Sequence, residues 1–438
     1  LVRQMNAIEA NYLNSDFFFD QNKAKIDRQA VSDLRSLALD GAESGKVRQP
    51  ALWYMTAGYM SLLQGNIDKA RTTLAKASEI PNGNANLKNQ IRLLANLTEL
   101  VSEGTLSKER EYGLWQSITW LKSLKEDGHN QTAPRALIIL MAQKYLTAGN
   151  FDRAVCYLAK ADYNFTVDFL LDAASTQDDL VSLERLLAKT GKDPVDAWLT
   201  KGFPYSSDDL HYIAGTKYMR KEAFREGLGE YRKIARTFWP AYWGRLKDGR
   251  EWASFFNDDI YLRTSFGASV PRKSLTRYDK LTFTEKLISL LDQAEKKPQN
   301  ASTDYYQIAN GLSYSPFWGY NDIIWKGTLV ESIKFFSPKD YPFNVGKLPG
   351  QMEKKYDQFT QEYASYRIPV KYYEKAMHTT KNREVAAKCC FLILQTEKKS
   401  NWFIEQEPPR YPEYRGVLSK DYKDTKFYRE ILKECPVR

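Results

Sequence analysis

One short stretch of this chain occurs twice, and the repetition constrains the fold more than any other feature. Residues 65–77 read GNIDKARTTLAKA and residues 149–161 read GNFDRAVCYLAKA, so eight of the thirteen positions are identical. In both copies a Gly-Asn pair separates two segments whose apolar residues recur every three or four positions. That spacing is typical of amphipathic helices, and glycine commonly ends a helix. Each copy therefore predicts a hairpin of two antiparallel helices.

The second copy shows the pattern most clearly. Its first helix carries one apolar stripe, formed by Leu137, Met141 and Tyr145. We expect Gly149 to end this helix and Asn150 to cap the next one. Weaker copies follow at residues 210–234 and, as a single second helix, at 369–377.

Small residues where two helices cross, a glycine hinge and then an aromatic with alanines give a pattern that resembles the tetratricopeptide repeat. The resemblance is specific to residues 51–80 and 135–164. It implies an all-α fold, an irregular α-α superhelix with long loops in its C-terminal third. The superhelix is irregular because the two copies lie 84 residues apart, which is no multiple of the usual period of about 34.

The residue pattern of the chain changes after about residue 262. Before it, helical periodicity is nearly unbroken, whereas proline-rich stretches such as SPKDYPFNVGKLPG (337–350) follow it. We expect residues 1–262 to form the tetratricopeptide-like solenoid. Residues 263–438 are then a helical continuation or a subdomain with Pro/Gly-rich loops.

Charge and cysteine usage exclude several classes of protein. The 64 basic and 54 acidic residues give a net charge of +10, but they are spread along the chain, which does not favour nucleic-acid binding. Four cysteines make no disulfide framework at this length. We expect Cys156, Cys389 and Cys390 to pack in the core.

No catalytic or metal-binding motif stands out. The three histidines, His129, His211 and His378, lie far apart, and neither His-Glu-x-x-His nor Cys-x-x-Cys occurs. Gly-x-Ser-x-Gly and a phosphate-binding Gly-Lys-Ser/Thr loop are also missing. We therefore expect a protein that is not an enzyme and that holds no cofactor and no metal.

The longest apolar runs, residues 136–142 and 389–394, are far shorter than the ~20 residues that span a bilayer. No membrane-spanning segment is expected. The chain opens at Leu1 without a signal-like segment, so we expect a processed or truncated product whose targeting signal lay upstream.

Two segments are rich in aromatic residues, 238–261 and 304–325. One interpretation is that they fill wide grooves between helices, and the helical spacing of Trp252, Phe255 and Phe256 favours this for the first segment. The other is that exposed aromatics bind a partner or stack on sugar rings. The residues predicted to bind are Trp239, Trp243, Tyr314 and Trp318.

Residues 372–399 and the aromatic run at 305–325 are also similar to large uncharacterised helical proteins of Bacteroidota cell envelopes. This resemblance implies an envelope location, periplasmic or associated with the outer membrane, with a lipoprotein-type portion upstream. Because a solenoid leaves a long groove open, we expect a non-catalytic scaffold that binds protein partners in a larger complex. The alternative is a helical module that binds glycans or the cell wall, either by itself or as part of an enzyme whose catalytic portion lies upstream.

Overall fold

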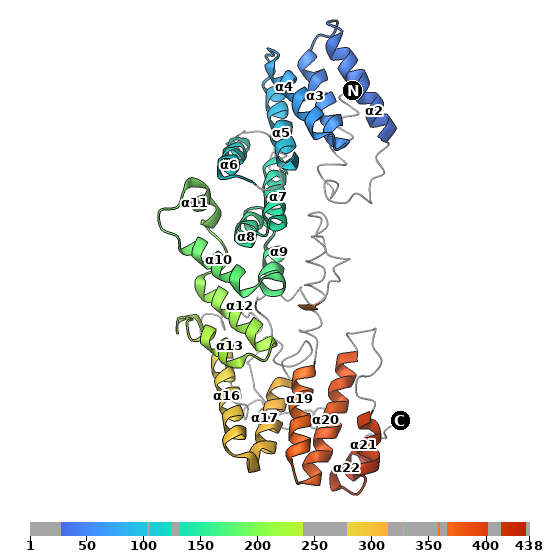
Figure 1. Cartoon of the computed structure of the whole chain (residues 1–438), viewed down its shortest axis with the longest axis vertical. Helices are drawn as coiled ribbons and strands as arrows, with labels where there is room; N and C mark the ends of the chain where they lie inside the picture. The colour runs from blue at the N-terminus through green and yellow to red at the C-terminus, as the bar shows by residue number, and fades with distance from the viewer. Residues whose placement is uncertain are drawn as a thin grey trace. The chain divides into compact units, whose positions relative to one another are not determined.

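A computed structural model describes residues 28–102, 106–123, 132–239, 278–313, 327, 358–359, 366–401 and 413–434. Its regular elements in these ranges are helices, and none of these residues forms a strand (Figure 1). The all-α prediction is therefore confirmed, and the fold is consistent with a helical-repeat protein.

The chain divides into two compact units. Unit 1 takes its described residues from Leu1–Val167 and Val181–Pro204, and unit 2 from Asp168–Leu180, Tyr205–Phe336 and Met352–Arg438. The expected boundary at residue 262 lies outside the described residues and stays a prediction.

The helices of unit 1 are α2 (Arg28–Glu43), α3 (Pro50–Leu63), α4 (Ile67–Glu79), α5 (Ala85–Ser102), α6 (Lys108–Ser123), α7 (Thr132–Thr147), α8 (Phe151–Lys160) and α11 (Pro194–Thr200). Two helices include residues of both units, α9 (Asn164–Phe169) and α10 (Gln177–Ala188). Unit 2 contains a π-helical turn (Leu170–Ala174), α12 (Ser207–Arg220), α13 (Phe224–Tyr231), α16 (Lys280–Lys296), a 3₁₀ turn (Pro298–Asn300), α17 (Ala301–Ser313), α19 (Arg367–Thr379), α20 (Arg383–Asn401), α21 (Glu413–Asp421) and α22 (Lys426–Glu434).

Both strong copies of the repeat form the predicted hairpins. Helix α3 packs against α4, and α7 packs against α8. The hinge glycines take the left-handed backbone conformation, with φ of +75° at Gly65 and +76° at Gly149. Asn150 stands at the N-cap of α8, but its side chain makes no capping hydrogen bond. The predicted side-chain cap does not form, because the backbone of Asn150 (φ −89°, ψ 75°) is not in the extended conformation typical of a capping residue. Its own N–H donates to Tyr145 O (2.8 Å) and closes the preceding helix.

The third copy forms the same turn without glycine. Glu222 occupies the hinge of the α12–α13 hairpin with φ of +61°, and the N–H of Ala223 donates to Tyr218 O (3.0 Å). A side chain in this conformation costs roughly 1 kcal/mol, which glycine avoids. The hydrogen bonds of the turn therefore define the hinge, and glycine is the residue that adopts its backbone conformation with the least strain.

Small residues bring the two helices of a hairpin close together. A Cβ atom placed on Gly58 would lie 2.7 Å from Leu74 Cγ, and one on Gly215 would collide with the ring of Tyr231. Gly58 and Gly215 occupy equivalent positions of the first and third copies. The predicted role of the small residues is confirmed at both sites.

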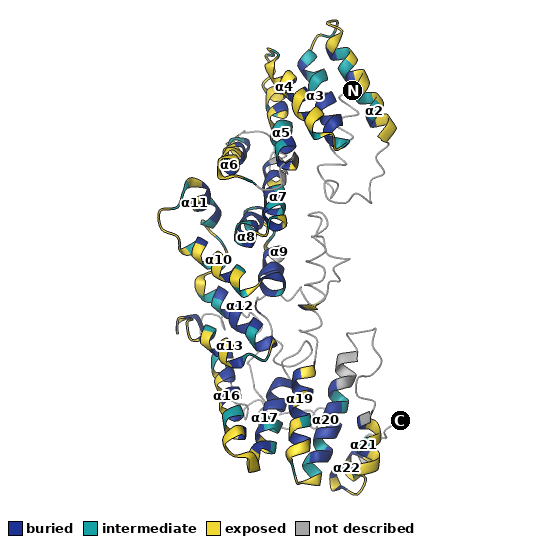
Figure 2. Ribbon diagram, in the orientation of Figure 1, coloured by how far each residue is buried: buried dark blue, intermediate teal, exposed yellow. Residues whose placement is uncertain are grey.

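A single hydrophobic core runs through the described helices of unit 2, from Tyr212 in α12 to Ile431 in α22. Helix α19 contains the fourth copy and is largely buried between α17 and α20 (Figure 2). Cys389 and Cys390 lie in this core, and Cys156 is equally buried in unit 1, as predicted. Burial raises the pKa of the Cys390 thiol to about 12, so it stays protonated.

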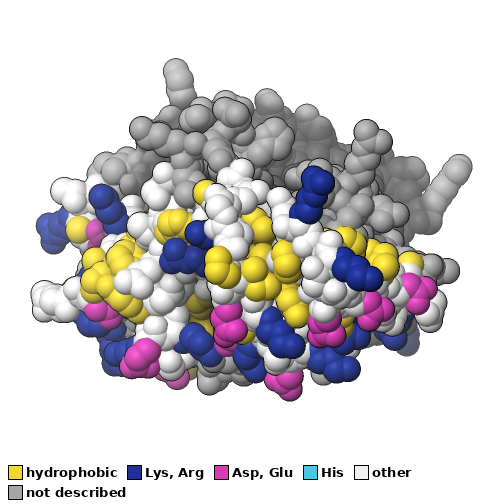
Figure 3. All heavy atoms as spheres, turned by 90° about the horizontal axis from the view of Figure 1, so that it is seen from above, with side chains coloured by type: hydrophobic (Ala, Val, Ile, Leu, Met, Phe, Trp, Pro, Cys, Tyr) yellow, Lys and Arg dark blue, Asp and Glu magenta, His cyan; other side chains and the backbone are white. Residues whose placement is uncertain are grey.

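None of the described helices is long and apolar enough to cross a membrane. In the end-on view of Figure 3, hydrophobic side chains form a band, and basic and acidic side chains alternate beside it. On this face the described charges are mixed in sign, unlike the single-sign surface typical of nucleic-acid binding.

Candidate functional site

The structure describes one of the four predicted binding residues, Trp239, and buries it. Its side chain is 7% exposed and contacts the rings of Tyr212, Tyr231 and Phe238 at centroid distances of 6.1, 5.9 and 5.8 Å. The expectation that Trp239 is exposed is wrong, because the turn after α13 folds residues 238 and 239 back onto the aromatic faces of the α12–α13 hairpin. For Trp239 the alternative, a core residue, is confirmed.

The other three residues, Trp243, Tyr314 and Trp318, lie outside the described residues. Their role in binding a partner stays a prediction. The carboxylates Asp258 and Asp259 of the first aromatic segment also lie outside the described part of the chain.

A groove opens in unit 1 between α4 and α5, with a volume of about 460 Å³. Three of its lining residues are buried, the apolar Leu74 and Ile91 and the polar Thr98, so the base of the groove is mainly apolar. Ala75 and Ala95 leave the groove open because they have only a methyl group. The remaining lining residues are polar or charged: Arg71, Ser78, Asn82, Lys88, Arg92 and Glu99.

Three cations border this groove. The guanidinium of Arg71 pairs with Glu99 Oε1 (2.9 Å), and that hydrogen bond raises the pKa of Arg71. Arg92 lies over the ring of Trp120 in α6, 4.2 Å from its centroid. Lys88 is exposed and makes no ion pair among the described residues. The groove therefore combines an apolar base with a mainly basic edge.

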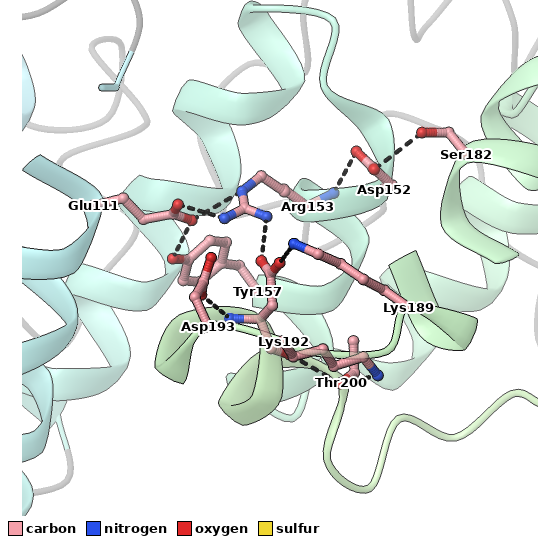
Figure 4. Close-up of polar contacts among 10 residues, drawn as sticks. Glu111, Asp152, Arg153, Tyr157, Ser182, Lys189, Lys192, Asp193 and Thr200 are labelled. Carbon is pink, nitrogen blue, oxygen red and sulfur yellow. Dashed lines mark hydrogen bonds and ion pairs between the residues drawn. The ribbon is translucent and has the colours of Figure 1, made fainter. Parts of the chain in front are cut away.

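A second polar assembly in unit 1, the Arg153 network, joins helices of different hairpins (Figure 4). Arg153 of α8 donates to Glu111 of α6 through two nitrogens (3.1 and 2.5 Å) and to Asp196 of α11 (2.7 Å). Lys189 of α10 also pairs with Asp196 (2.5 Å), and the hydroxyl of Tyr157 donates to Glu111 (2.7 Å). The network thus contains two carboxylates and two cations.

The Arg153 network acts as a structural tie, that is, a set of ion pairs and hydrogen bonds that holds helices together. Burial and the charge of Glu111 raise the pKa of Tyr157, so it remains a neutral donor. Burial alone would raise the pKa of Asp196, but hydrogen bonds from Lys189 and Arg153 lower it. Glu111 and Asp196 are both 2% exposed and both held by cations, so neither is placed to exchange protons with a substrate.

Unit 2 buries another group of charges around the π-helical turn. Arg220 pairs with Asp172 (2.5 Å), and Lys217 donates to the carbonyl oxygen of Asp172 (2.8 Å). One turn earlier, Asp168 accepts a hydrogen bond from Tyr205, and burial raises its pKa to about 6. These contacts hold α12 against the turn.

The sequence pattern predicts neither charged assembly, although the repeat contains a signal for the first. Arg153 and Tyr157 stand where the first copy has Lys69 and Thr73. The second copy thus has an arginine and a buried aromatic residue at these two positions. This difference indicates that its second helix packs against other elements than the second helix of the first copy does. The described residues contain no group of three side chains suited to bind a metal ion.

Comparisons with known proteins do not assign the chain to a family. No family model, curated protein or solved structure matches the chain. Function is therefore argued from the helical hairpins and from the groove and charged clusters that they carry.

Proposed function

We propose that this chain is a non-catalytic scaffold that binds a segment of a protein partner in the groove between α4 and α5. The observation that carries the proposal is the groove itself, about 460 Å³ with an apolar base and a basic edge. That volume is within the range of about 300–1,000 Å³ typical of sites that enclose ligands, and it suits a few side chains of a bound segment.

The composition of the groove favours binding over catalysis. Its ionisable lining residues are Arg71, Lys88, Arg92 and Glu99. Glu99 is occupied by Arg71 and by Arg110, whose Nη2 lies 2.7 Å from Glu99 Oε2. Apolar contact with Leu74 and Ile91 would supply affinity, while the cations would orient the segment and speed its approach.

A photo-crosslinking amino acid at Ala75, introduced into the full chain in its native host, tests the proposal. Thr72 is exposed on the same helix but does not line the groove, so the same label at Thr72 is the matched control. We expect a discrete partner segment to be crosslinked from position 75 and not from position 72. Ala95→Trp should abolish the crosslink by filling the groove, whereas equal labelling from both positions would refute the assignment.

The envelope location and the alternative of glycan binding stay predictions. Glycan binding depended on the two aromatic segments, of which Trp239 is buried and residues 240–261 and 314–325 lie outside the described residues. Quenching of tryptophan fluorescence by wall oligosaccharides would support it, and an unchanged signal would count against it.

A further inference from the structure

A second charged cluster of unit 1 surrounds Trp198 in α11. The Arg153 network fixes this helix through Asp196, and Asp193 caps it by accepting the N–H of Asp196 (2.8 Å). The indole of Trp198 packs against the ring of Tyr157, with 6.0 Å between centroids. Trp198 is therefore held in place by the same tie that joins α6, α8 and α11.

Two lysines, Lys122 near the end of α6 and Lys160 at the end of α8, place their ammonium groups beside this indole. The Nζ atoms of Lys122 and Lys160 both lie 5.6 Å from the ring centroid of Trp198. Lys160 Nζ also donates a hydrogen bond to the carbonyl oxygen of Lys201, which brings the Lys201 backbone alongside. We call these four residues the lysine–tryptophan cluster.

No carboxylate compensates these lysines among the described residues. None of Lys122, Lys160 and Lys201 forms an ion pair there. Burial is the main cause that lowers the pKa of Lys160, and the neighbouring charges of Lys122 and Lys201 lower it further. Lysines at helix C-termini are ordinarily explained by the helix dipole, but that field acts on each helix end separately and does not require Lys122 and Lys160 to meet at one indole.

The type of cation indicates the type of anion. Phosphate sites typically combine any lysine they use with the fork of arginine or with the free N–H groups of a helix N-terminus. The lysine–tryptophan cluster offers ammonium groups only, placed at the C-terminal ends of α6, α8 and α11. Ammonium groups on separate flexible stems can each pair with a different carboxylate along a chain.

We propose that Lys122 and Lys160 at Trp198, together with Lys201 beside Lys160, bind an acidic segment of a protein partner, that is, a run of Asp and Glu residues. The cluster shares no residue with the groove between α4 and α5. Its failure would leave the groove proposal standing, and the reverse is also true.

Binding of a fluorescein-labelled octaglutamate peptide to the full chain, followed by fluorescence anisotropy at low salt, tests the proposal. We expect Lys122→Glu and Lys160→Glu each to weaken binding about tenfold, because each change replaces an attractive charge by a repulsive one. Lys69→Glu on the exposed face of α4 makes the same change in net charge away from the cluster. It should weaken binding less than about twofold, since only the general field changes.

Two measurements keep the result unambiguous. Far-UV circular dichroism and thermal unfolding verify that each variant is folded, and Lys160→Gln provides a milder change that should weaken binding about threefold. The proposal is overturned if Lys69→Glu weakens binding as much as the cluster variants do. It is also overturned if calorimetry detects pyrophosphate binding that needs Lys160 while octaglutamate does not bind, because the cluster would then be a phosphate site.

Discussion

Two charged clusters meet at α11 of unit 1, and they differ in balance. In the Arg153 network, two buried carboxylates face two cations, and every charge has a partner within 3.1 Å. In the lysine–tryptophan cluster, three lysines gather with no carboxylate among the described residues. Tyr157 and Trp198, which contact each other, link the two.

The comparison separates charge that serves the fold from charge that is available to a partner. A buried ion must be paired, or its desolvation destabilises the protein, so a balanced cluster is explained by stability alone. A partly exposed cluster of like charges contributes little to stability, and its charges gain most from an added anion. The balanced network fixes α11, and α11 in turn presents the unbalanced cluster.

The largest effect should come from removing the central cation of the balanced network. Arg153→Met leaves Glu111 and Asp196 buried without it, and we expect a loss of about 4 kcal/mol of unfolding free energy. Arg110→Met is the matched control, because its pair with Glu99 is exposed and should contribute less than about 1 kcal/mol. Urea denaturation of both variants measures the difference, and similar losses would show that the Arg153 network is not the structural tie.

Asp168 in unit 2 sharpens the comparison, because it is a buried acid without an ion-pair partner among the described residues. Its pKa of about 6 lies above the ordinary 3.8, so between about pH 4 and pH 6 the folded chain retains a proton that the unfolded chain loses. Stability due to this group is full below pH 4 and falls as the pH rises through 6, by up to about 3 kcal/mol.

Asp168→Asn should remove that dependence, since an amide still accepts the hydrogen bond from Tyr205 but does not ionise. We expect the variant to be more stable than the wild-type chain by about 2 kcal/mol at pH 7.5 and equal to it near pH 4. The measured quantity is the difference between the two proteins, which cancels the other titrating groups. A difference that stays constant with pH would exclude a titrating Asp168.

The smallest effect on stability is expected in the lysine–tryptophan cluster. Single Lys→Gln changes at positions 122, 160 and 201 should alter the unfolding free energy by less than about 0.5 kcal/mol. Urea midpoints measure these shifts, and a loss comparable to that of Arg153→Met would erase the distinction between the clusters.

The helical hairpins could be predicted because their cause is local. Gly149, the stripe at Leu137, Met141 and Tyr145, and the small residue Gly58 act within one hairpin, where sequence distance and spatial distance nearly coincide. The error at Asn150 was also local, since the side-chain cap depends on the backbone angles of Asn150, and composition does not determine them.

The sites could not be predicted because they join different hairpins. Glu111 in the polar run KEREYG resembles a solvated face, and only the packing of α6 against α7 and α11 buries it beside Arg153. Trp239 is likewise assigned to the core by the α12–α13 hairpin and not by its neighbours in sequence. The groove depends on how the connection between α4 and α5 places Ala75 opposite Ala95, and a helical period does not determine that.

One variant tests most directly the claim that unbalanced charge serves binding and not the fold. In the triple variant Lys122→Gln, Lys160→Gln, Lys201→Gln, octaglutamate affinity and unfolding free energy are measured on the same sample. The predicted result is binding weakened by a factor of ten or more with stability changed by less than about 1 kcal/mol. Retained binding together with a stability loss of several kcal/mol would contradict it and place these lysines in the structural framework.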